Sequence, residues 1–270
     1  MDAEARTLTS RDGTPIACWS SGAGPSLLLI HGAMQDHTRW SEISPPLEER
    51  FTVYTFDRRG RGESGDGPDY SMHHECEDAV AVVEQIGGPV TVLGHSYGAG
   101  IALEAALMTD RIDRLVLYEP GILEGVSGFY DGERVAASLA KAERQIQAGD
   151  NEKGIVTLLR EVIEVPDSDI DLIKSMPSWP SRVASAGTVA RELRGEGSWV
   201  FDPARYAHLA IPVLLLTGSE SYQIARDGTA ALHKALPNSR VVEMEGQGHA
   251  AMTTAPELFV REVLTFLAGV

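Results

Sequence analysis

The sequence predicts an α/β protein in which a mostly parallel, eight-stranded sheet is flanked by helices. Short apolar runs alternate with helical stretches along most of the chain, which is typical of β-α-β units. The alternation stops between Glu119 and Ile211, where the sequence predicts several helices broken by prolines. In the first half, the pentapeptide Gly94-His95-Ser96-Tyr97-Gly98 lies between an apolar run and a helical stretch. Together these observations predict an open sheet, a helical insertion and a serine at a strand-to-helix turn.

The individual elements follow from local patterns. Residues 5–21 predict two strands joined at Asp12-Gly13, since Asp-Gly is a strong hairpin signal. Continuous apolar runs are expected for parallel strands that helices cover on both faces. Beyond the hairpin, the predicted strands are 26–30, 51–56, 89–93, 114–118, 212–217 and 240–244, and the predicted helices are 38–50, 71–86, 99–108, 224–236 and 256–267.

The pentapeptide has the pattern of a nucleophile elbow. A tight turn from strand to helix strains the backbone of Ser96 and exposes its hydroxyl above the sheet. Gly94 and Gly98 have no Cβ atoms, so the turn can close where larger residues would collide. The alternative is a glycine-rich turn whose serine caps a helix. The strand before the motif and the helix after it favour the elbow.

Length, charge and cysteine content narrow the classes of function. The chain has 270 residues, 43% of them hydrophobic, which suffices for one large domain with an insertion. Its formal net charge of −16 disfavours nucleic acid and anionic membranes as partners, because both attract basic surfaces. Two cysteines give no disulfide framework, and the sequence shows neither a signal peptide nor a membrane-length apolar run. We therefore expect a cytoplasmic protein.

Four motifs occur in an order that resembles the α/β-hydrolase superfamily. They are His31-Gly32, Asp57-Arg58-Arg59-Gly60-Arg61-Gly62-Glu63-Ser64, the Ser96 pentapeptide and Gly246-Gln247-Gly248-His249. Within the superfamily, the chain is similar to small capped serine hydrolases of actinobacterial type, which are esterase- or lactonase-like. The resemblance implies an α/β-hydrolase core over residues 1–120 and 208–270. It also implies a helical cap over residues 121–207, inserted after the sixth strand.

The resemblance implies roles for particular residues. Ser96 is the expected nucleophile and His249 the expected base, because a serine hydroxyl needs a neighbouring base to react. The backbone N–H groups of Ala33 and Tyr97 are expected to form the oxyanion hole. Structural roles are expected for three further residues of these motifs, His31, His95 and Asp57.

The acid of the triad departs from the usual pattern of the superfamily. Most members carry an aspartate three residues after the glycine that ends the seventh strand, and here Ser221 occupies that position. Glu220 lies one residue earlier, whereas Glu119 follows the sixth strand, where some dehalogenases and lactonases of this superfamily carry a catalytic glutamate. We expect Glu119 to be the acid, because Pro120 restricts the backbone after it, and Glu220 is the alternative.

These residues predict hydrolysis of a carboxylic ester or lactone through an acyl-enzyme. The same serine and histidine could serve carbon–carbon bond hydrolysis, perhydrolysis or a lyase reaction, and a ligand receptor without turnover is a further alternative. No metal cluster and no phosphate-binding glycine loop with lysine is present, so no cofactor is expected. The partner is expected to be a small apolar or aromatic molecule in a pocket lined by Met34, Met176 and Trp179. A monomer or a homodimer is expected.

Overall fold

The computed structural model describes all residues except 1–3, 68, 122–131, 164, 194–200 and 270, and in the described residues eight strands form one sheet. The strand order is β1-β2-β4-β3-β5-β6-β7-β8. Strand β2 is antiparallel to both neighbours, and all the other neighbouring pairs are parallel. The strands are β1 (Glu4–Thr9), β2 (Pro15–Gly22), β3 (Ser26–Ile30), β4 (Thr52–Phe56), β5 (Val90–His95), β6 (Ile112–Tyr118), β7 (Val213–Gly218) and β8 (Ser239–Met244). The predicted fold class is confirmed.

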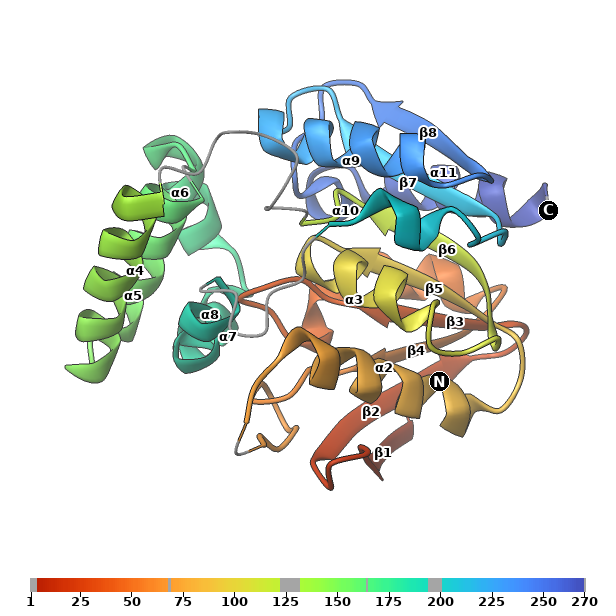
Figure 1. Ribbon diagram of the computed structural model, residues 1–270, viewed down its shortest axis with the longest axis horizontal. Coiled ribbons are helices and arrows are strands. Elements are labelled where there is room, and N and C mark those ends of the chain that lie inside the picture. Colours follow the sequence, from red (N-terminus) through yellow and green to blue (C-terminus); the bar gives the residue numbers. More distant parts are fainter. Residues whose placement is uncertain (1–3, 68, 122–131, 164, 194–200, 270) are drawn as a thin grey trace.

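Helices cover both faces of the sheet (Figure 1). The helices α2 (Met72–Ile86), α3 (Tyr97–Ala105) and α9 (Gln223–Ala235) pack on one face through a shared apolar cluster. The helices α1 (Ser44–Glu48) and α11 (Pro256–Ala268) pack on the other face through a second cluster. Because both faces are covered, β5 and β7 are buried along their whole length, which explains their continuous apolar sequences.

The carboxyl ends of the central parallel strands meet at one edge of the sheet. Strands β3, β5, β6 and β7 are parallel neighbours, so the residues that follow them lie side by side at this edge. In an open α/β sheet, that edge is where ligands bind. Ser96 follows β5 directly and Glu119 follows β6 directly.

A group of helices lies between β6 and β7, where the sequence predicts the helical insertion of residues 121–207. Most of the group lies to the left of the sheet in Figure 1, whereas its last 3₁₀ turn packs in the apolar cluster that α2, α3 and α9 share. The parts 122–131, 164 and 194–200 of the predicted insertion lie outside the described residues. The described elements are α4 (Gly132–Gln147), α5 (Asn151–Thr157), a π-helical turn (Leu158–Val162), α6 (Asp167–Ser175), α7 (Trp179–Ala184), α8 (Ala186–Leu193) and the 3₁₀ turn η3 (Pro203–Tyr206).

Buried ion pairs fasten this helical group to the sheet. Glu192 of α8 accepts hydrogen bonds from Arg58 and Arg61, which lie in the glycine-rich loop after β4. Next to it, at the surface, Arg191 makes two 2.8 Å hydrogen bonds to the Asp66 carboxylate. Paired in this way, the buried charges avoid the cost of burial without a partner.

The helix predicted over residues 38–50 is wrong as a single element. The structure has the 3₁₀ turn η1 (His37–Trp40) followed by the short helix α1. Pro45 and Pro46 lie at the start of α1, where their missing N–H groups are tolerated, whereas inside a longer helix they would each remove a hydrogen bond. The prolines therefore begin a new helix here.

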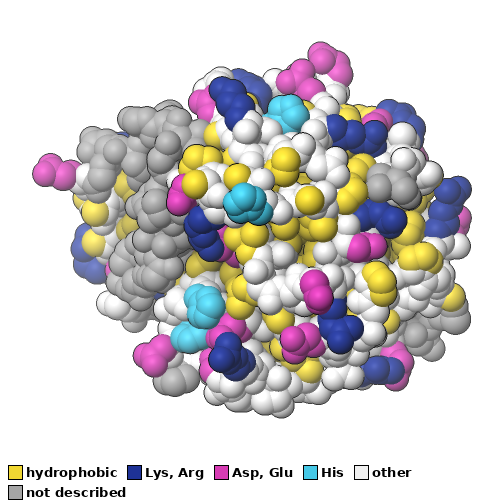
Figure 2. All heavy atoms as spheres, turned by 45° about the vertical axis from the view of Figure 1, so that its right-hand side comes forward, with side chains coloured by type: hydrophobic (Ala, Val, Ile, Leu, Met, Phe, Trp, Pro, Cys, Tyr) yellow, Lys and Arg dark blue, Asp and Glu magenta, His cyan; other side chains and the backbone are white. Residues whose placement is uncertain are grey.

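Charges of both signs are dispersed over the face of the molecule shown in Figure 2. Acidic and basic side chains alternate there, so this face carries no extended basic tract among the described residues. Of the helices that the structure describes, none has the length and apolar content needed to cross a membrane.

Candidate active site

The turn between β5 and α3 has the geometry of a nucleophile elbow. Ser96 has φ 55° and ψ −122°, a strained conformation for a residue with a Cβ atom. A Cβ atom on Gly98 would lie 2.3 Å from the Ile30 carbonyl oxygen, and one on Gly94 would lie 2.5 Å from the Gly98 carbonyl oxygen. Both positions therefore require glycine, as the sequence predicts. The turn also places Ser96 at the N-terminal end of α3.

Backbone strain gathers at this edge of the sheet. Among the described residues other than glycine, positive φ angles occur at Met34 (57°), Ser96 (55°) and Glu119 (46°). All three belong to the site that the sequence predicts, in the loop after β3, at the elbow and after β6. Such conformations persist where the surrounding structure enforces them, and they are concentrated at functional sites.

His249 and Glu119 form a hydrogen-bonded pair, although 130 positions separate them in the chain. The Nδ1 atom of His249 lies 2.5 Å from Oε2 of Glu119. When the carboxylate is ionised, Nδ1 carries the proton and donates it, so the lone pair is left on Nε2. The His249 side chain is 31% exposed and the Glu119 side chain is fully buried. This arrangement suits a histidine that accepts a proton at Nε2.

The second oxygen of Glu119 is held by the end of β7. Oε1 accepts hydrogen bonds from the Gly218 N–H at 2.8 Å, from the Thr217 hydroxyl at 3.2 Å and from the Ser221 hydroxyl. Burial by itself raises the pKa of Glu119, but the hydrogen bonds from His249 and from these donors outweigh burial and lower that pKa. The carboxylate is therefore ionised at neutral pH, despite its burial.

The carboxylate of Glu220, the alternative acid, makes no hydrogen bond to His249 in the described structure. Its side chain is exposed, and its backbone N–H donates to the Gln247 carbonyl oxygen at 2.9 Å. The neighbouring Ser221, at the position where the superfamily usually has aspartate, instead donates its hydroxyl proton to Glu119. The geometry therefore brings Glu119, rather than Glu220, to His249.

Two backbone donors near Ser96 are available for an oxyanion. Within the described residues, no acceptor is hydrogen-bonded to the N–H of Ala33 or to the N–H of Tyr97. Tyr97 is the first residue of α3, so its N–H also lies at the positive end of the helix dipole. Gly32 lets the Ala33 loop approach the elbow, since a Cβ atom there would lie 3.1 Å from Cβ of Ser96.

His31 is a buried structural residue, as the resemblance implies. The side chain is fully buried, with Nδ1 2.9 Å from the Gly32 carbonyl oxygen and Nε2 accepting the Arg58 N–H at 3.2 Å. Burial, reinforced by the charge of Arg58, lowers the pKa of His31 well below its ordinary value. A neutral imidazole with both nitrogens engaged holds the loop and is not available as a base.

His95 and Tyr118 hold the loop that carries His249. A structural role is expected for His95, whereas no role is predicted for Tyr118. Nε2 of His95 lies 3.0 Å from the His249 carbonyl oxygen. The Tyr118 hydroxyl donates to the Gly248 carbonyl oxygen and accepts the Ala251 N–H at 3.2 Å, so it bridges the residues on either side of His249. Burial raises the pKa of the Tyr118 hydroxyl, which therefore keeps its proton. Tyr118 is the last residue of a predicted strand. This position at the edge of the sheet is the feature of the sequence that could have indicated its role.

Replacing Tyr118 with phenylalanine is expected to lower kcat about tenfold while changing KM less, because a small displacement of a base lowers the reaction rate steeply. The measurement is steady-state hydrolysis of 4-nitrophenyl acetate. Tyr54→Phe, which removes a hydroxyl from β4, serves as the matched control. A kcat for Tyr118→Phe equal to that of the control would show that the hydroxyl does not position His249.

Two of the three predicted pocket residues, Met34 and Trp179, belong to the contact between the helical group and the loop after β3. Met34 is buried in an apolar cluster with residues of α4, α5 and α8, and Trp179 packs against the same cluster. The Trp179 ring is also 5.8 Å from the Lys174 ammonium. Met176, at the C-terminal end of α6, is half-buried. These positions are compatible with an apolar wall facing the loop after β3.

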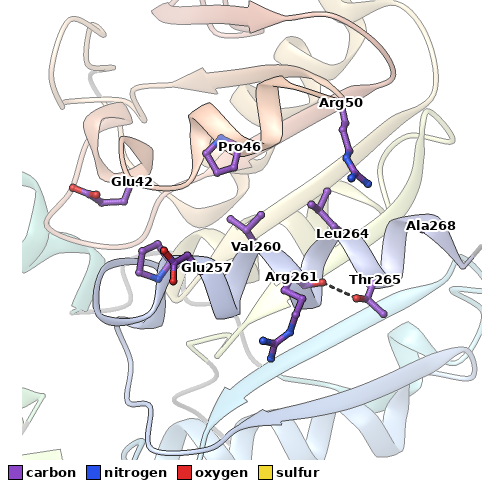
Figure 3. Close-up of a pocket in the computed structure, with 10 residues that line it drawn as sticks. Glu42, Pro46, Arg50, Glu257, Val260, Arg261, Leu264, Thr265 and Ala268 are labelled. Atoms are coloured by element: carbon purple, nitrogen blue, oxygen red, sulfur yellow. Dashed lines mark hydrogen bonds between the residues drawn. The ribbon is translucent and has the colours of Figure 1, made fainter.

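A groove of about 630 Å³ lies elsewhere, between α1 and α11 (Figure 3). Its walls include Pro46 and Arg50 on one side and Val260 and Leu264 on the other. It is open to solvent, and none of its lining residues belongs to the His249–Glu119 pair or to the elbow. The chemistry of the site therefore does not involve this groove.

One group of potential metal ligands, Asp36, His37 and Asp57, occurs in the described part of the chain. The hydrogen bonds of Asp57 explain it without a metal. Oδ1 accepts both the backbone N–H and Nδ1 of His37 at 2.8 Å, and Oδ2 accepts the Glu63 N–H at 2.8 Å. Asp57 thus fixes the backbone of two loops, as expected.

Comparison with known proteins finds relatives that share the fold. The model of the alpha/beta hydrolase family matches residues 27–262. An alpha/beta hydrolase from Sphaerobacter thermophilus is 31% identical and superimposes with a TM-score of 0.84 over 97% of this chain and 100% of the other. The carboxylesterase CesB from Bacillus subtilis, at 22% identity, shares the fold with a TM-score of 0.76 over 100% of this chain and 93% of its own. The 2-(acetamidomethylene)succinate hydrolase of Mesorhizobium japonicum is 24% identical over 255 residues, which cover 91% of this chain and 89% of that protein.

Proposed function

The chain belongs to the alpha/beta hydrolase family, and we propose that it is a serine hydrolase that cleaves a carboxylic ester or lactone through an acyl-enzyme. The observation that carries the proposal is the His249–Glu119 pair at the edge of the sheet where Ser96 occupies a strained elbow. The name of the hydrolase relative from Mesorhizobium japonicum supports a hydrolytic reaction.

In the first half of the proposed reaction, the Ser96 oxygen attacks the ester carbonyl carbon. Nε2 of His249 takes the hydroxyl proton as the new C–O bond forms, and the carbonyl electron pair moves onto the oxygen. The N–H groups of Ala33 and Tyr97 stabilise that oxyanion. When the intermediate collapses, His249 returns the proton to the departing alkoxide, which leaves as an alcohol or stays attached in a lactone.

In the second half, water hydrolyses the acyl-enzyme by the same route. His249 takes a proton from water, the hydroxide attacks the acyl carbon, and Ser96 leaves with the proton that His249 returns. Glu119 keeps its charge throughout and stabilises the imidazolium that forms twice in each cycle. The lowered pKa of Glu119 supports this role, because a protonated carboxyl could not stabilise that cation.

The helical group between β6 and β7 is proposed to be a cap over the reaction site, within the boundaries 121–207. The apolar cluster that joins the cap to Met34 supports a pocket for the apolar or aromatic part of a small substrate. Trp179 and Met176 are proposed to lie in the wall of that pocket.

The proposal is tested by burst kinetics with 4-nitrophenyl acetate and butyrate. A serine hydrolase that deacylates slowly should release a burst of one equivalent of 4-nitrophenol per chain, followed by a slower steady state. Mass spectrometry of the quenched protein should then find the acyl group on Ser96. Tight binding of esters without any release of 4-nitrophenol would instead assign the chain to the class of receptors.

A further inference from the structure

Two buried arginines beside the site have no carboxylate partner among the residues that the structure describes. Arg39 in η1 is 7% exposed and Arg182 in α7 is 8% exposed. Arg39 donates to the Thr253 hydroxyl and has Nη2 2.6 Å from the Met252 sulfur, but its buried Nε has no partner. The Arg182 guanidinium makes no hydrogen bond or ion pair within the described residues, and its Nε is also buried.

The other buried arginines of the described chain differ from these two. Arg58 binds Glu75 and Glu192, Arg59 binds Asp12 and Asp78, and Arg61 binds Glu192. A buried charge is strongly unfavourable unless an opposite charge and hydrogen bonds compensate it. These three arginines have carboxylate partners, even though the Nε of Arg61 also lacks an acceptor, whereas Arg39 and Arg182 have no carboxylate partner among the described residues.

Arg39 and Arg182 lie close to each other and to the catalytic edge. The residue before Arg182, Ser181, donates a hydrogen bond to Asp36 at the start of η1, which brings α7 against η1. Arg39 contacts α10 (Ala251–Thr254), which begins two residues after His249. The two guanidinium charges also act on a common neighbour at the elbow, His95.

Burial acts against both charges, and the charge of Arg182 adds to the cost at Arg39. Burial, followed by the charge of Arg182, lowers the pKa of Arg39 to about 9. Burial lowers the pKa of Arg182 to about 10. Both groups remain protonated at neutral pH, and neither has a carboxylate counter-ion among the described residues. An anionic ligand would relieve both costs at once.

We propose that Arg39 and Arg182 bind a carboxylate group of the substrate, so that the enzyme acts on half-esters of dicarboxylic acids. The proposal rests on the proposed serine hydrolase and names its substrate class. Arginine matches a carboxylate with two parallel hydrogen bonds, which adds orientation to charge. With a formal net charge of −16, the chain as a whole repels anions, so a local pair of cations is needed to hold one beside His249.

The first test compares the monomethyl and dimethyl esters of succinic, glutaric and adipic acid, with methanol release as the measurement. The wild-type enzyme should prefer the half-ester of at least one acid by at least about tenfold in kcat/KM, as expected for hydrogen bonds to charged groups. Arg182→Met should reduce that preference by at least about tenfold. Arg160→Met removes an exposed arginine from the same helical group and is the matched control, for which the preference should stay.

The second test measures binding without chemistry. In the Ser96→Ala variant, glutarate should raise Tm, because it binds the folded state, and it should not raise Tm when Arg182→Met is added. Inorganic phosphate is the competing anion and should raise Tm less than glutarate. Without any ligand, Arg182→Met should raise Tm by at least about 2 °C, because a buried unpaired charge is replaced by an apolar side chain.

The outcomes separate this proposal from the proposed function. Turnover of neutral esters without any half-ester preference, and with no effect of glutarate on Tm, would refute the carboxylate site and leave the serine hydrolase standing. Stabilisation by glutarate without turnover of any ester would support a carboxylate site and refute the serine hydrolase. A fall in Tm for ligand-free Arg182→Met would show that Arg182 has a structural role. A larger rise in Tm with phosphate than with glutarate would show that the site binds a phosphate group in preference to a carboxylate. Either result would overturn the proposal.

Discussion

Replacement of Ser96 by alanine is expected to lower kcat for 4-nitrophenyl acetate by at least about 10⁴-fold, which is the largest effect we expect from a single substitution. The variant lacks the oxygen that forms the acyl-enzyme, so the histidine and the oxyanion donors have no nucleophile to assist. Steady-state release of 4-nitrophenol measures the loss, and mass spectrometry checks that no acyl adduct accumulates.

The fold of this variant should be retained, because alanine occupies the same strained position with a smaller side chain. Circular dichroism and Tm close to the wild-type values would establish this. Ser175→Ala, which removes an exposed hydroxyl from the end of α6, is the matched control and should keep wild-type kcat. Hydrolysis by Ser96→Ala at a rate near that of the control would falsify the serine-hydrolase mechanism.

The second large effect is expected at Glu119, where substitution by glutamine should lower kcat by at least about 10²-fold. The amide keeps the shape of the side chain but loses its charge, so it no longer stabilises the His249 imidazolium. Loss of the corresponding acid in a serine protease costs about 10⁴-fold. The same change should weaken the hydrogen bonds that hold Oε1, because Gly218, Thr217 and Ser221 then donate to a neutral acceptor.

Glu220→Gln is the matched control for this prediction, since it removes a carboxylate from the neighbouring loop. Its exposed side chain makes no hydrogen bond to His249 in the described structure, so kcat should fall by less than about tenfold. If Glu220→Gln proved the more damaging variant, the acid would be Glu220, and Glu119 would be a structural residue at the end of β6.

The half-ester proposal refines the expectation of an apolar substrate. Met34 and Trp179 support an apolar part, and Arg39 with Arg182 supports an anionic end. A pocket with mostly apolar walls and a few placed polar groups holds both, because apolar contact contributes affinity and the charged pair contributes orientation. The carboxylate and the ester would then be bound at different points of one site.

Local sequence determined the elements and the elbow. Strand and helix order follows from apolar runs and turn residues, which act over a few positions. Gly94 and Gly98 are required because Cβ atoms there would collide with the backbone of adjacent segments. A Gly-x-Ser-x-Gly motif between a strand and a helix predicts this requirement. His249 could be predicted because its glycine loop follows the last strand. Over residues 38–50, Pro45 and Pro46 favour the start of a new helix after the 3₁₀ turn η1, and the single predicted helix is therefore wrong.

Tertiary structure decided which residues meet. Glu119 and Glu220 both follow strands at the same edge, and only the register of β6 against β7 brings Glu119 between His249 and Ser221. The hydrogen bond from the Tyr118 hydroxyl to the His249 loop joins residues 130 positions apart, so no local sequence pattern predicts it. The sequence likewise does not show that Arg39 and Arg182 have no carboxylate partner. Whether a buried arginine is paired depends on which side chains the fold places beside it. Sequence patterns report short-range sterics and periodicity, whereas the pairing of charges and hydrogen bonds depends on distances that exist only in the folded chain.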